Sequence, residues 1–144
     1  MANIQPVHSP CYCVNFRHAA NILTKYYDEA LAEIQLTANQ FFLLVSISQL
    51  EACNKSELAQ YTRLDRTTII RNLGVLRKKD LVEEVPGETK RNNLIRLSER
   101  GTQSVAAGMV IWERLQAETQ AAIGEEALPV LWQLLERIDQ LAGS

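Results

Sequence analysis

The chain has 144 residues, 47% of them hydrophobic, and a formal net charge of −2 at pH 7. That length suits one compact domain, or two small ones that share a core, and the apolar content excludes a largely disordered protein. The longest apolar runs, such as FFLLV, are too short for a membrane span or a signal-peptide core, so we expect a cytoplasmic protein without membrane contact, whose three cysteines form no disulfide scaffold.

The N-terminal part of the chain predicts three helices. Ser9 can cap a helix that has a proline at its first position, and apolar residues then recur at helical spacing as far as Ile34. A second helix, with the sequence QFFLLVSISQL, starts at Thr37 and is apolar nearly all round, which is typical of a buried helix. The segment NKSELAQYT predicts a short helix capped by Asn54 or Ser56.

The middle of the chain predicts a fourth helix and a β-hairpin. Asp65 is a good N-cap for a helix that runs to Lys79, and Ile69, Leu73 and Leu76 fall on one face of it. The strands VEEV and LIRL follow, joined by the charged, turn-rich loop PGETKRNN. A short helix, a tight turn, a longer helix and a hairpin form a winged helix-turn-helix.

Two helices complete the chain. Ser98 can cap a long helix that Gly124 breaks after about Ile123. The last helix has Pro129 in its first turn and carries an apolar stripe of Leu128, Leu131, Leu135, Ile138 and Leu141. Because the first and last helices would be unstable alone, we expect them to bury their stripes against each other and against a second copy of the chain.

The predicted fold class is mainly α with a small β-hairpin wing. Residues 37–98 form the winged helix-turn-helix in this prediction, and residues 1–36 and 99–144 form a helical dimerisation region. Residues 55–100 carry 11 Lys and Arg against 7 Asp and Glu, whereas the remainder carries 4 against 10. A basic middle between acidic flanks is typical of a polyanion-binding module on a separate scaffold, although an ordinary charged surface would give the same totals.

The fourth helix presents a face that suits double-stranded DNA. At 100° per residue, the side opposite its core residues carries Thr67, Arg71, Gly74 and Lys78, with Thr68 and Val75 beside them. The hydroxyls can bond phosphates or base edges, and Arg71 can bond O6 and N7 of guanine in the major groove. Gly74 lets the helix backbone approach closely.

The hairpin tip offers a second contact with DNA. Lys90 and Arg91 lie there, and a basic loop on a two-stranded ribbon can reach the adjacent minor groove and its phosphates. The alternative is a winged helix that binds protein without specific DNA binding. The polar, glycine-containing face of the fourth helix argues against it, because protein grooves favour aromatic and aliphatic anchors.

The chain resembles the MarR family of winged-helix transcription regulators along nearly its whole length. The matching segments are LTANQFFLLVSI, LDRTTIIRNLGVLRKKDLVE and KRNNLIRLSERG. In the last of these, Arg91, Ser98 and Gly101 match the family's wing signature, but Thr89 stands where the family has an Asp that orients the wing Arg. The resemblance implies a homodimer that represses transcription at a pseudo-palindromic operator and is released by a ligand or by thiol oxidation.

Cys11 and Cys13 lie at the predicted start of the first helix, as its second and fourth residues. Residues two apart on a helix point about 200° from each other, so the two thiols cannot easily share a metal ion or bond each other. With His8 as the only third ligand, we predict no metal site. A thiol enzyme would need a base, and His18 is ~10.5 Å from Cys11 along the helix, so we predict no enzyme and no cofactor.

The helix start favours a charged sulfur at Cys13, because free N–H groups and the helix dipole meet there and Arg17 lies one turn further on. In the branch of the family that senses organic hydroperoxides, the reactive cysteine matches Cys13 and its helix-one tyrosine partner matches Tyr27. A second tyrosine partner, from the other subunit, would fall at Ala38 and is absent. Packing at a dimer interface is the alternative role for Cys11 and Cys13.

Two further expectations concern the interior. Cys53 precedes the short third helix and is interpreted as a buried space-filling residue. The family's usual ligand pocket lies between the dimer helices and the DNA-binding lobe and often takes small aromatic acids. The residues that could line it here, or pack in the core instead, are Tyr12, Phe16, Tyr26 and Trp112.

Overall fold

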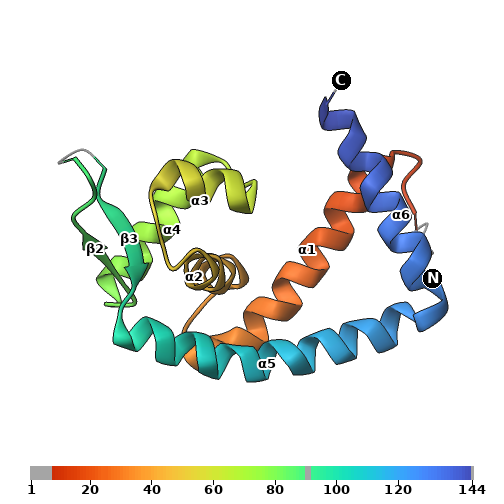
Figure 1. Cartoon of the computed structure of the whole chain (residues 1–144). Helices are drawn as coiled ribbons and strands as arrows, with labels where there is room; N and C mark the ends of the chain where they lie inside the picture. The colour runs from red at the N-terminus through yellow and green to blue at the C-terminus, as the bar shows by residue number, and fades with distance from the viewer. Residues whose placement is uncertain (1–7, 90–91, 144) are drawn as a thin grey trace. The chain divides into compact units, whose positions relative to one another are not determined.

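The structure is a computed structural model that describes residues 8–89 and 92–143. The chain forms two compact units, Met1–Gly108 and Met109–Ser144. Most of the described chain is helical, and a small sheet lies in the first unit (Figure 1). These features confirm the predicted class, mainly α with a small β element. The functional division at residues 37 and 98 stays a prediction.

The first unit contains a three-stranded sheet and a series of helices. In chain order its elements are α1 (Tyr12–Leu31), α2 (Ala38–Leu50), β1 (Ala52–Cys53), α3 (Lys55–Thr62), α4 (Arg66–Lys78), β2 (Val82–Val85), β3 (Leu94–Leu97) and the start of α5 (Glu99–Ile123). A short 3₁₀ turn follows α1. The sequence α3, turn, α4 and hairpin is that of a winged helix-turn-helix.

Helix α2 forms the centre of the first unit, because it contacts α1, α3, α4, β1 and β3. Thr37 caps it in a reciprocal pair with Gln40: the Gln40 amide donates to Thr37 Oγ1 at 3.2 Å, and the Thr37 amide donates to Gln40 Oε1 at 3.1 Å. The apolar residues that α2 and α4 bury include Leu43, Leu44, Ile47, Ile69, Leu73 and Leu76. The predicted core face of α4 and the predicted burial of α2 are therefore confirmed, although Phe42 of α2 is 45% exposed.

The sheet has the strand order β1-β3-β2 and is antiparallel throughout. The predicted strands VEEV and LIRL are confirmed at 82–85 and 94–97. The prediction of a two-stranded hairpin was incomplete, because Cys53 pairs with Ile95 and adds β1 on the far side of β3. A strand of two residues has no measurable periodicity, so the sequence pattern could not reveal it.

The start of α1 differs from the prediction. The helix begins at Tyr12, and Cys11 has an extended backbone with φ −93° and ψ 116°. The Ser9 hydroxyl still accepts a hydrogen bond from the Cys11 amide at 3.1 Å, but Ser9 also exchanges two bonds of 2.8 Å with the Asn15 side chain. These bonds hold Ser9 and Cys11 in a turn ahead of the first helical residue.

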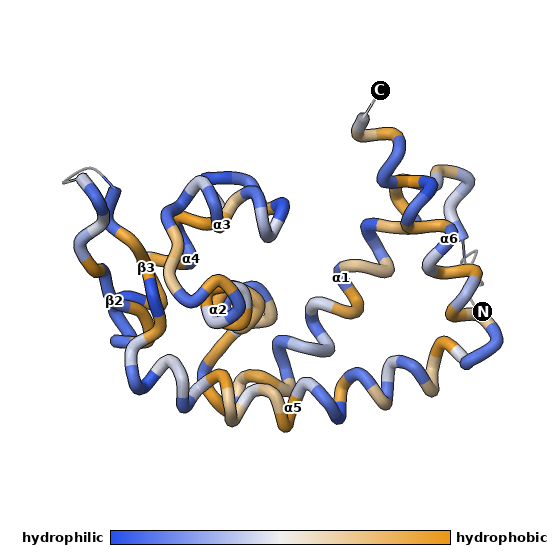
Figure 2. The backbone as a smooth tube through the Cα atoms, viewed as in Figure 1, coloured by the Kyte–Doolittle hydropathy of each residue, from blue (hydrophilic) through white to orange (hydrophobic). Residues whose placement is uncertain are grey.

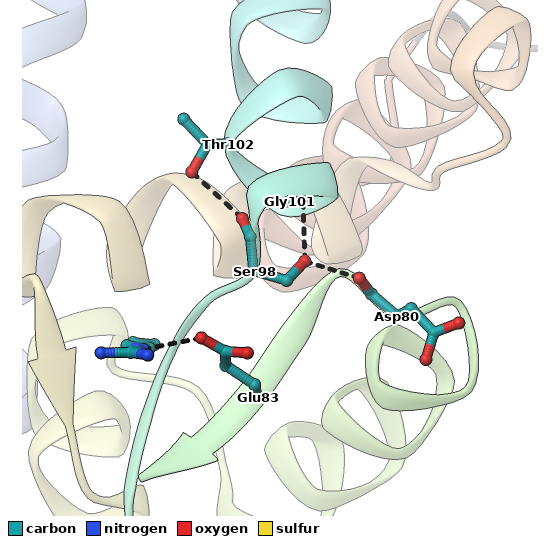
Figure 3. Close-up of polar contacts among 6 residues, drawn as sticks. Asp80, Glu83, Ser98, Gly101 and Thr102 are labelled. Carbon is teal, nitrogen blue, oxygen red and sulfur yellow. Dashed lines mark hydrogen bonds and ion pairs between the residues drawn. The ribbon is translucent and has the colours of Figure 1, made fainter.

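Ser98 joins β3 to α5, as Figure 3 shows. Its hydroxyl accepts a hydrogen bond from the Gly101 amide at 3.0 Å and donates to the Asp80 carbonyl, and its amide donates to the Leu81 carbonyl at 3.1 Å. The predicted cap at Ser98 is confirmed. The same residue fastens the start of α5 to the segment that connects α4 with β2.

The second unit contains the rest of α5 and helix α6 (Leu128–Asp139), separated by Gly124 and a 3₁₀ turn. Gly124 has φ +89°, which glycine adopts without strain, so α5 ends where predicted. Pro129 lies in the first turn of α6, as expected. No residue of α6 is buried, and Figure 2 shows apolar residues recurring along it. Its apolar stripe is therefore only partly covered in the single chain: Leu128 and Leu131 are half-buried, and Leu135 and Ile138 are exposed.

No single helix in the part of the chain that the structure describes is long and apolar enough to cross a membrane. One pair of segments, Tyr12–Ile34 and Ala38–Leu50, reaches that length and composition only when combined, and it is bent by 71°.

Candidate nucleic-acid interface

Helices α3 and α4 and the turn between them position the candidate DNA-reading face. In the cap of α3, the Glu57 amide donates to Asn54 Oδ1 at 2.8 Å and the Asn54 amide donates to Glu57 Oε2 at 2.9 Å. Arg63 ends α3 in the left-handed conformation, with φ 57°, which turns the chain toward α4. Asp65 then caps α4, so the caps predicted at Asn54 and Asp65 are both confirmed.

Asp65 engages one of the predicted DNA contacts. The Thr68 hydroxyl donates to Asp65 Oδ2 at 2.7 Å, and the Thr68 amide donates to Oδ1 at 2.8 Å. These bonds lower the pKa of the Asp65 carboxyl from its ordinary value, so it stays charged at neutral pH. A phosphate would therefore compete with Asp65 for the hydroxyl hydrogen of Thr68.

The predicted outward face of α4 is open in the structure. Thr67, Arg71 and Lys78 are exposed, and Gly74 is half-buried. A Cβ built on Gly74 would meet no atom within 4 Å, so open space borders the backbone there. Among the described residues, no carboxylate forms an ion pair with Arg71. Its guanidinium is therefore available to an external partner.

Three exposed residues of α4 were missed at the sequence level: Arg66, Ile70 and Arg77. On the helical wheel, Arg66 and Ile70 lie on one side of Thr67, at about 100° and 60°, so the spacing could have located them. Ile69 and Ile70 are adjacent, but Ile69 is fully buried whereas Ile70 is 47% exposed. The apolar character of Ile70 concealed its position on the outer surface.

We define the wing as β2, β3 and the loop between them. Glu83 of β2 accepts a hydrogen bond from Arg96 Nε of β3 at 2.7 Å. Glu84 accepts one from Arg77 of α4 and another from Asn93 Nδ2, the latter at 3.3 Å. Glu84 thus fastens the wing to the end of α4, and Arg77 is engaged within the chain.

The tip of the wing is only partly described. Lys90 and Arg91, the predicted wing contacts, lie outside the described residues. Thr89, at the position where the family has an Asp, accepts a hydrogen bond from the Asn92 amide at 3.0 Å through its carbonyl. This bond uses the backbone of Thr89 and not its side chain.

A polar cleft of about 410 Å³ lies between the wing and the first residues of α3 and α4. Lys55 and Ser56 line it from α3, Arg66 from α4 and Asn93 from the wing, together with Glu84. Hydroxyl, amide and cationic side chains are the groups that hold DNA phosphates. The lining therefore suits a backbone phosphate better than an apolar ligand.

The later start of α1 changes the placement of the N-terminal cysteines. Cys11 is the cap residue and Cys13 the second helical residue, so the premise that both are helical, from which opposite thiol directions were expected, is wrong. Both are exposed, and Arg17 Nη2 lies 3.7 Å from Cys13 Sγ, as its spacing predicted. Within residues 8–89 and 92–143, no three His, Cys, Asp or Glu side chains could hold a metal ion.

Tyr27 lies on the same continuous helix as Cys13, fourteen residues further on. At 1.5 Å per residue the two are about 21 Å apart along the axis, so they cannot meet within one chain. The Tyr27 ring instead contacts Tyr26 edge to face, with centroids 6.2 Å apart. Any pairing of Cys13 with Tyr27 requires a second copy of α1. Of the residues proposed for a ligand pocket, Tyr12, Phe16, Tyr26 and Trp112 are all exposed.

Cys53 is only 1% exposed, which confirms the expected buried residue. Burial, and to a smaller extent the charge of Glu57, raises the pKa of its thiol from 9.0 to about 11. The unfolded chain loses this proton near pH 9 and the folded chain near pH 11. In that window the unfolded state binds fewer protons, so the free energy of unfolding must fall as the pH rises.

Because of Cys53, we expect the free energy of unfolding to be about 2 kcal/mol lower at pH 10.5 than at pH 8. Urea unfolding of the parent and of Cys53→Ala at both pH values measures it. The variant should be less stable at pH 8 but lose about 2 kcal/mol less on going to pH 10.5. Equal losses in the two proteins would contradict the assignment.

The chain is similar in sequence and in structure to known DNA-binding proteins. A family model described as a winged helix DNA-binding domain matches residues 36–101. The chain is similar to the M. tuberculosis transcriptional regulator MosR in complex with DNA, with 34% identity, a TM-score of 0.81, and coverage of 92% of this chain and 96% of that one. No curated protein matches the sequence.

Two more distant structures share the fold. A mutant MarR from E. coli, complexed with operator DNA, has 23% identity and a TM-score of 0.80, with 88% of this chain and 91% of that one covered. Bordetella bronchiseptica BpsR, solved to explain how 6-hydroxynicotinic acid regulates its DNA binding, has 20% identity and a TM-score of 0.82, with 94% and 99% covered.

Proposed function

The chain belongs to the MarR family of DNA-binding transcription regulators, and on that premise we propose that it acts as a repressor. In this proposal a homodimer binds a pseudo-palindromic operator in double-stranded DNA. A small-molecule ligand or the oxidation of a thiol then releases it.

The outward face of α4 is the observation that carries the proposal. An α-helix fits the major groove, where a guanidinium can bond O6 and N7 of guanine. Arg71 is exposed and without a carboxylate partner among the described residues, and the backbone at Gly74 borders open space. Thr67 and Lys78 would bond phosphates beside the groove, and the polar cleft at Lys55 would hold another. Lys90 and Arg91 stay the proposed minor-groove contacts.

Arg71→Ala tests this face. We expect operator affinity to fall by about 1–3 kcal/mol and base preference to relax at one position in each half-site. Affinity for unrelated DNA should fall less, because phosphates dominate that binding. An operator recovered by gel shift from genomic fragments would be titrated, at fixed salt, with the variant and with single-base changes.

Arg114→Ala is the matched control, since it removes one exposed positive charge from α5. It should keep the parent's base preferences. If Arg71→Ala ranked the operator variants as the parent does, at equal affinity, α4 would not read bases through this residue. Failure to recover any sequence-specific fragment would favour a winged helix that binds protein.

Exposed apolar side chains on α1 and α6 support the homodimer. Leu31 is the only buried residue among the 20 of α1, all of which are described. Large apolar residues exposed on the two helices include Val14, Phe16, Ile22, Leu23, Val130, Trp132, Leu134, Leu135 and Ile138. Monomeric soluble proteins seldom leave so much apolar surface uncovered. We propose that a second copy of the chain covers both helices.

For release by oxidation, we propose Cys13 as the sensor and Cys11 as secondary. An organic hydroperoxide would transfer one oxygen to the Cys13 sulfur, giving a sulfenate and the corresponding alcohol. Exposure at the start of α1 and the Arg17 guanidinium at 3.7 Å support this choice. The new polar group would lie at the proposed dimer interface, near the partner's α1, and would shift the spacing of the two DNA-binding lobes.

Cys13→Ser is therefore expected to bind the operator as the parent does and to ignore organic hydroperoxide, while Cys11→Ser still responds. Operator titrations with and without hydroperoxide, with mass spectrometry of each cysteine, provide the measurement. Unchanged affinity of a parent whose Cys13 is shown to be oxidised would leave both cysteines as interface packing.

Release by a ligand is the other route that we propose. Tyr12, Phe16 and Tyr26 present aromatic surface on α1, and Trp112 does so on α5. A small aromatic acid is the class of ligand that the family resemblance implies, and aromatic side chains could stack against its ring. If an aromatic acid weakened operator binding in Cys13→Ser as strongly as in the parent, ligand control would be separated from oxidation.

A further inference from the structure

Ile70 is an apolar side chain on an otherwise polar face. It is 47% exposed on α4, although the preceding residue, Ile69, is fully buried. Arg66 and Thr67, one turn before it, are exposed, as is Arg71, which follows it. Single exposed apolar residues are common on proteins, so exposure alone does not assign a role. The position of Ile70, beside the proposed guanine-binding residue, is the informative feature.

Only one base presents an apolar group in the major groove, the C5-methyl of thymine. The edge of cytosine presents an N4 donor instead, which an isoleucine cannot satisfy and would exclude from water. Consecutive residues of a helix differ by 1.5 Å in rise, whereas stacked base pairs are about 3.4 Å apart, so Ile70 and Arg71 would reach the same or adjacent base pairs.

The charges around Ile70 favour DNA as the partner at this face. Arg66 and Arg71 flank it, and no carboxylate pairs with either of them among residues 8–89 and 92–143. The polar cleft that Arg66 lines would hold a phosphate close to this side of α4. In such a complex Arg66 would contact a phosphate and Arg71 a guanine. Ile70, which lies between them, would then face a thymine methyl group.

We propose that Ile70 is a specificity-determining residue that packs against the C5-methyl of a thymine, at or next to the guanine bound by Arg71. The inference rests on the proposed function, because it requires α4 to enter the major groove. Each half-site of the operator then contains a thymine whose methyl group leaves water in the complex. A cytosine at that position is disfavoured.

Deoxyuridine provides a direct test, because it differs from thymidine only by the C5-methyl. An operator would first be selected from random DNA by the parent protein. Each thymine would then be replaced singly with deoxyuridine, and affinities measured by fluorescence anisotropy at constant salt. At one thymine position in each half-site, replacement should lower the parent's affinity for the operator about fourfold. Replacing that thymine in both half-sites should lower it about sixteenfold.

Two variants separate Ile70 from its neighbour. Ile70→Ala should bind thymine and deoxyuridine operators equally at that position, whereas Arg71→Ala should keep the sensitivity to deoxyuridine while losing preference for guanine. Circular dichroism and urea unfolding of Ile70→Ala should match the parent, because the side chain is half exposed. The conservative Ile70→Val should retain part of the sensitivity.

The outcomes distinguish this inference from the proposed function. If the parent selects a specific operator but no deoxyuridine replacement weakens binding, the role of Ile70 is wrong and the function stands. The same holds if Ile70→Ala keeps the parent's sensitivity. If no sequence is enriched from random DNA, the proposed function is wrong and the inference falls with it, and a protein partner would be sought for α4.

Discussion

Ile138→Glu is expected to be largely monomeric at concentrations where the parent is a dimer, and to lose most of its operator affinity. Ile138 lies on the apolar stripe of α6, one residue before the helix ends, and is 40% exposed in the single chain. A second copy that covers the stripe would bury it, and burying an unpaired carboxylate is strongly unfavourable. Since both copies carry the substitution, the dimer should weaken by about 4 kcal/mol, roughly a thousandfold.

Gln133→Glu is the matched control, because it adds the same charge on the opposite side of α6. Sedimentation equilibrium should show a parent-like dimer for this variant and dissociation for Ile138→Glu. The parent itself should have no stable folded monomer at micromolar concentration. A folded parent monomer, or an intact Ile138→Glu dimer with full operator affinity, would show that α6 is not the dimer interface.

The second large effect is expected at Gly101, near the start of α5. A Cβ there would lie 1.9 Å from the carbonyl oxygen of Leu81. That oxygen already accepts the Ser98 amide at 3.1 Å, so it cannot retreat without breaking the joint between wing and α5. We expect Gly101→Ala to lower the free energy of unfolding by about 3 kcal/mol. Urea unfolding at a fixed chain concentration measures the difference.

Gly74→Ala provides the comparison, since a Cβ at Gly74 meets nothing within 4 Å. Alanine favours a helix interior over glycine, so this variant should gain up to about 1 kcal/mol in stability. Its operator affinity should nevertheless fall if the backbone at Gly74 approaches DNA closely. Similar stability changes in the two glycine variants would contradict the packing described at Gly101.

Elements with strong local signals could be predicted from the sequence. Asp65 sits ahead of a periodic apolar pattern, and its side chain caps the first turn without help from distant residues. The strands VEEV and LIRL are bounded by turn residues, and their bounds were predicted correctly. Gly124 ends α5 because its backbone adopts a positive φ, a property that the sequence alone could suggest.

The misses depended on partners outside the local pattern. The start of α1 is set by bonds between Ser9 and Asn15, six residues apart, and no capping rule includes that pair. Strand β1 exists because Cys53 pairs with Ile95, far along the chain. At the candidate site, by contrast, helical spacing correctly predicted that Thr67, Arg71 and Lys78 of α4 are exposed.

Hydrogen bonds within the chain determine which side chains at the site are available to DNA, and the sequence pattern does not reveal them. Thr68 gives its hydroxyl hydrogen to Asp65, and Arg77 is held by Glu84, neither of which follows from helical periodicity. The exposure of Ile70 was concealed by its apolar character, because a pattern-based core assignment places isoleucine inside.

Methylation interference at guanine N7 tests most directly whether a dimer of this chain reads DNA through α4. The parent should be blocked by methyl groups at guanines in two clusters centred about 10 base pairs apart, roughly 34 Å, on the same face of the duplex. In Arg71→Ala, interference at one guanine per cluster should disappear. A single cluster, or no interference at any guanine on a fragment that the parent binds specifically, would contradict recognition by two α4 helices in successive major grooves.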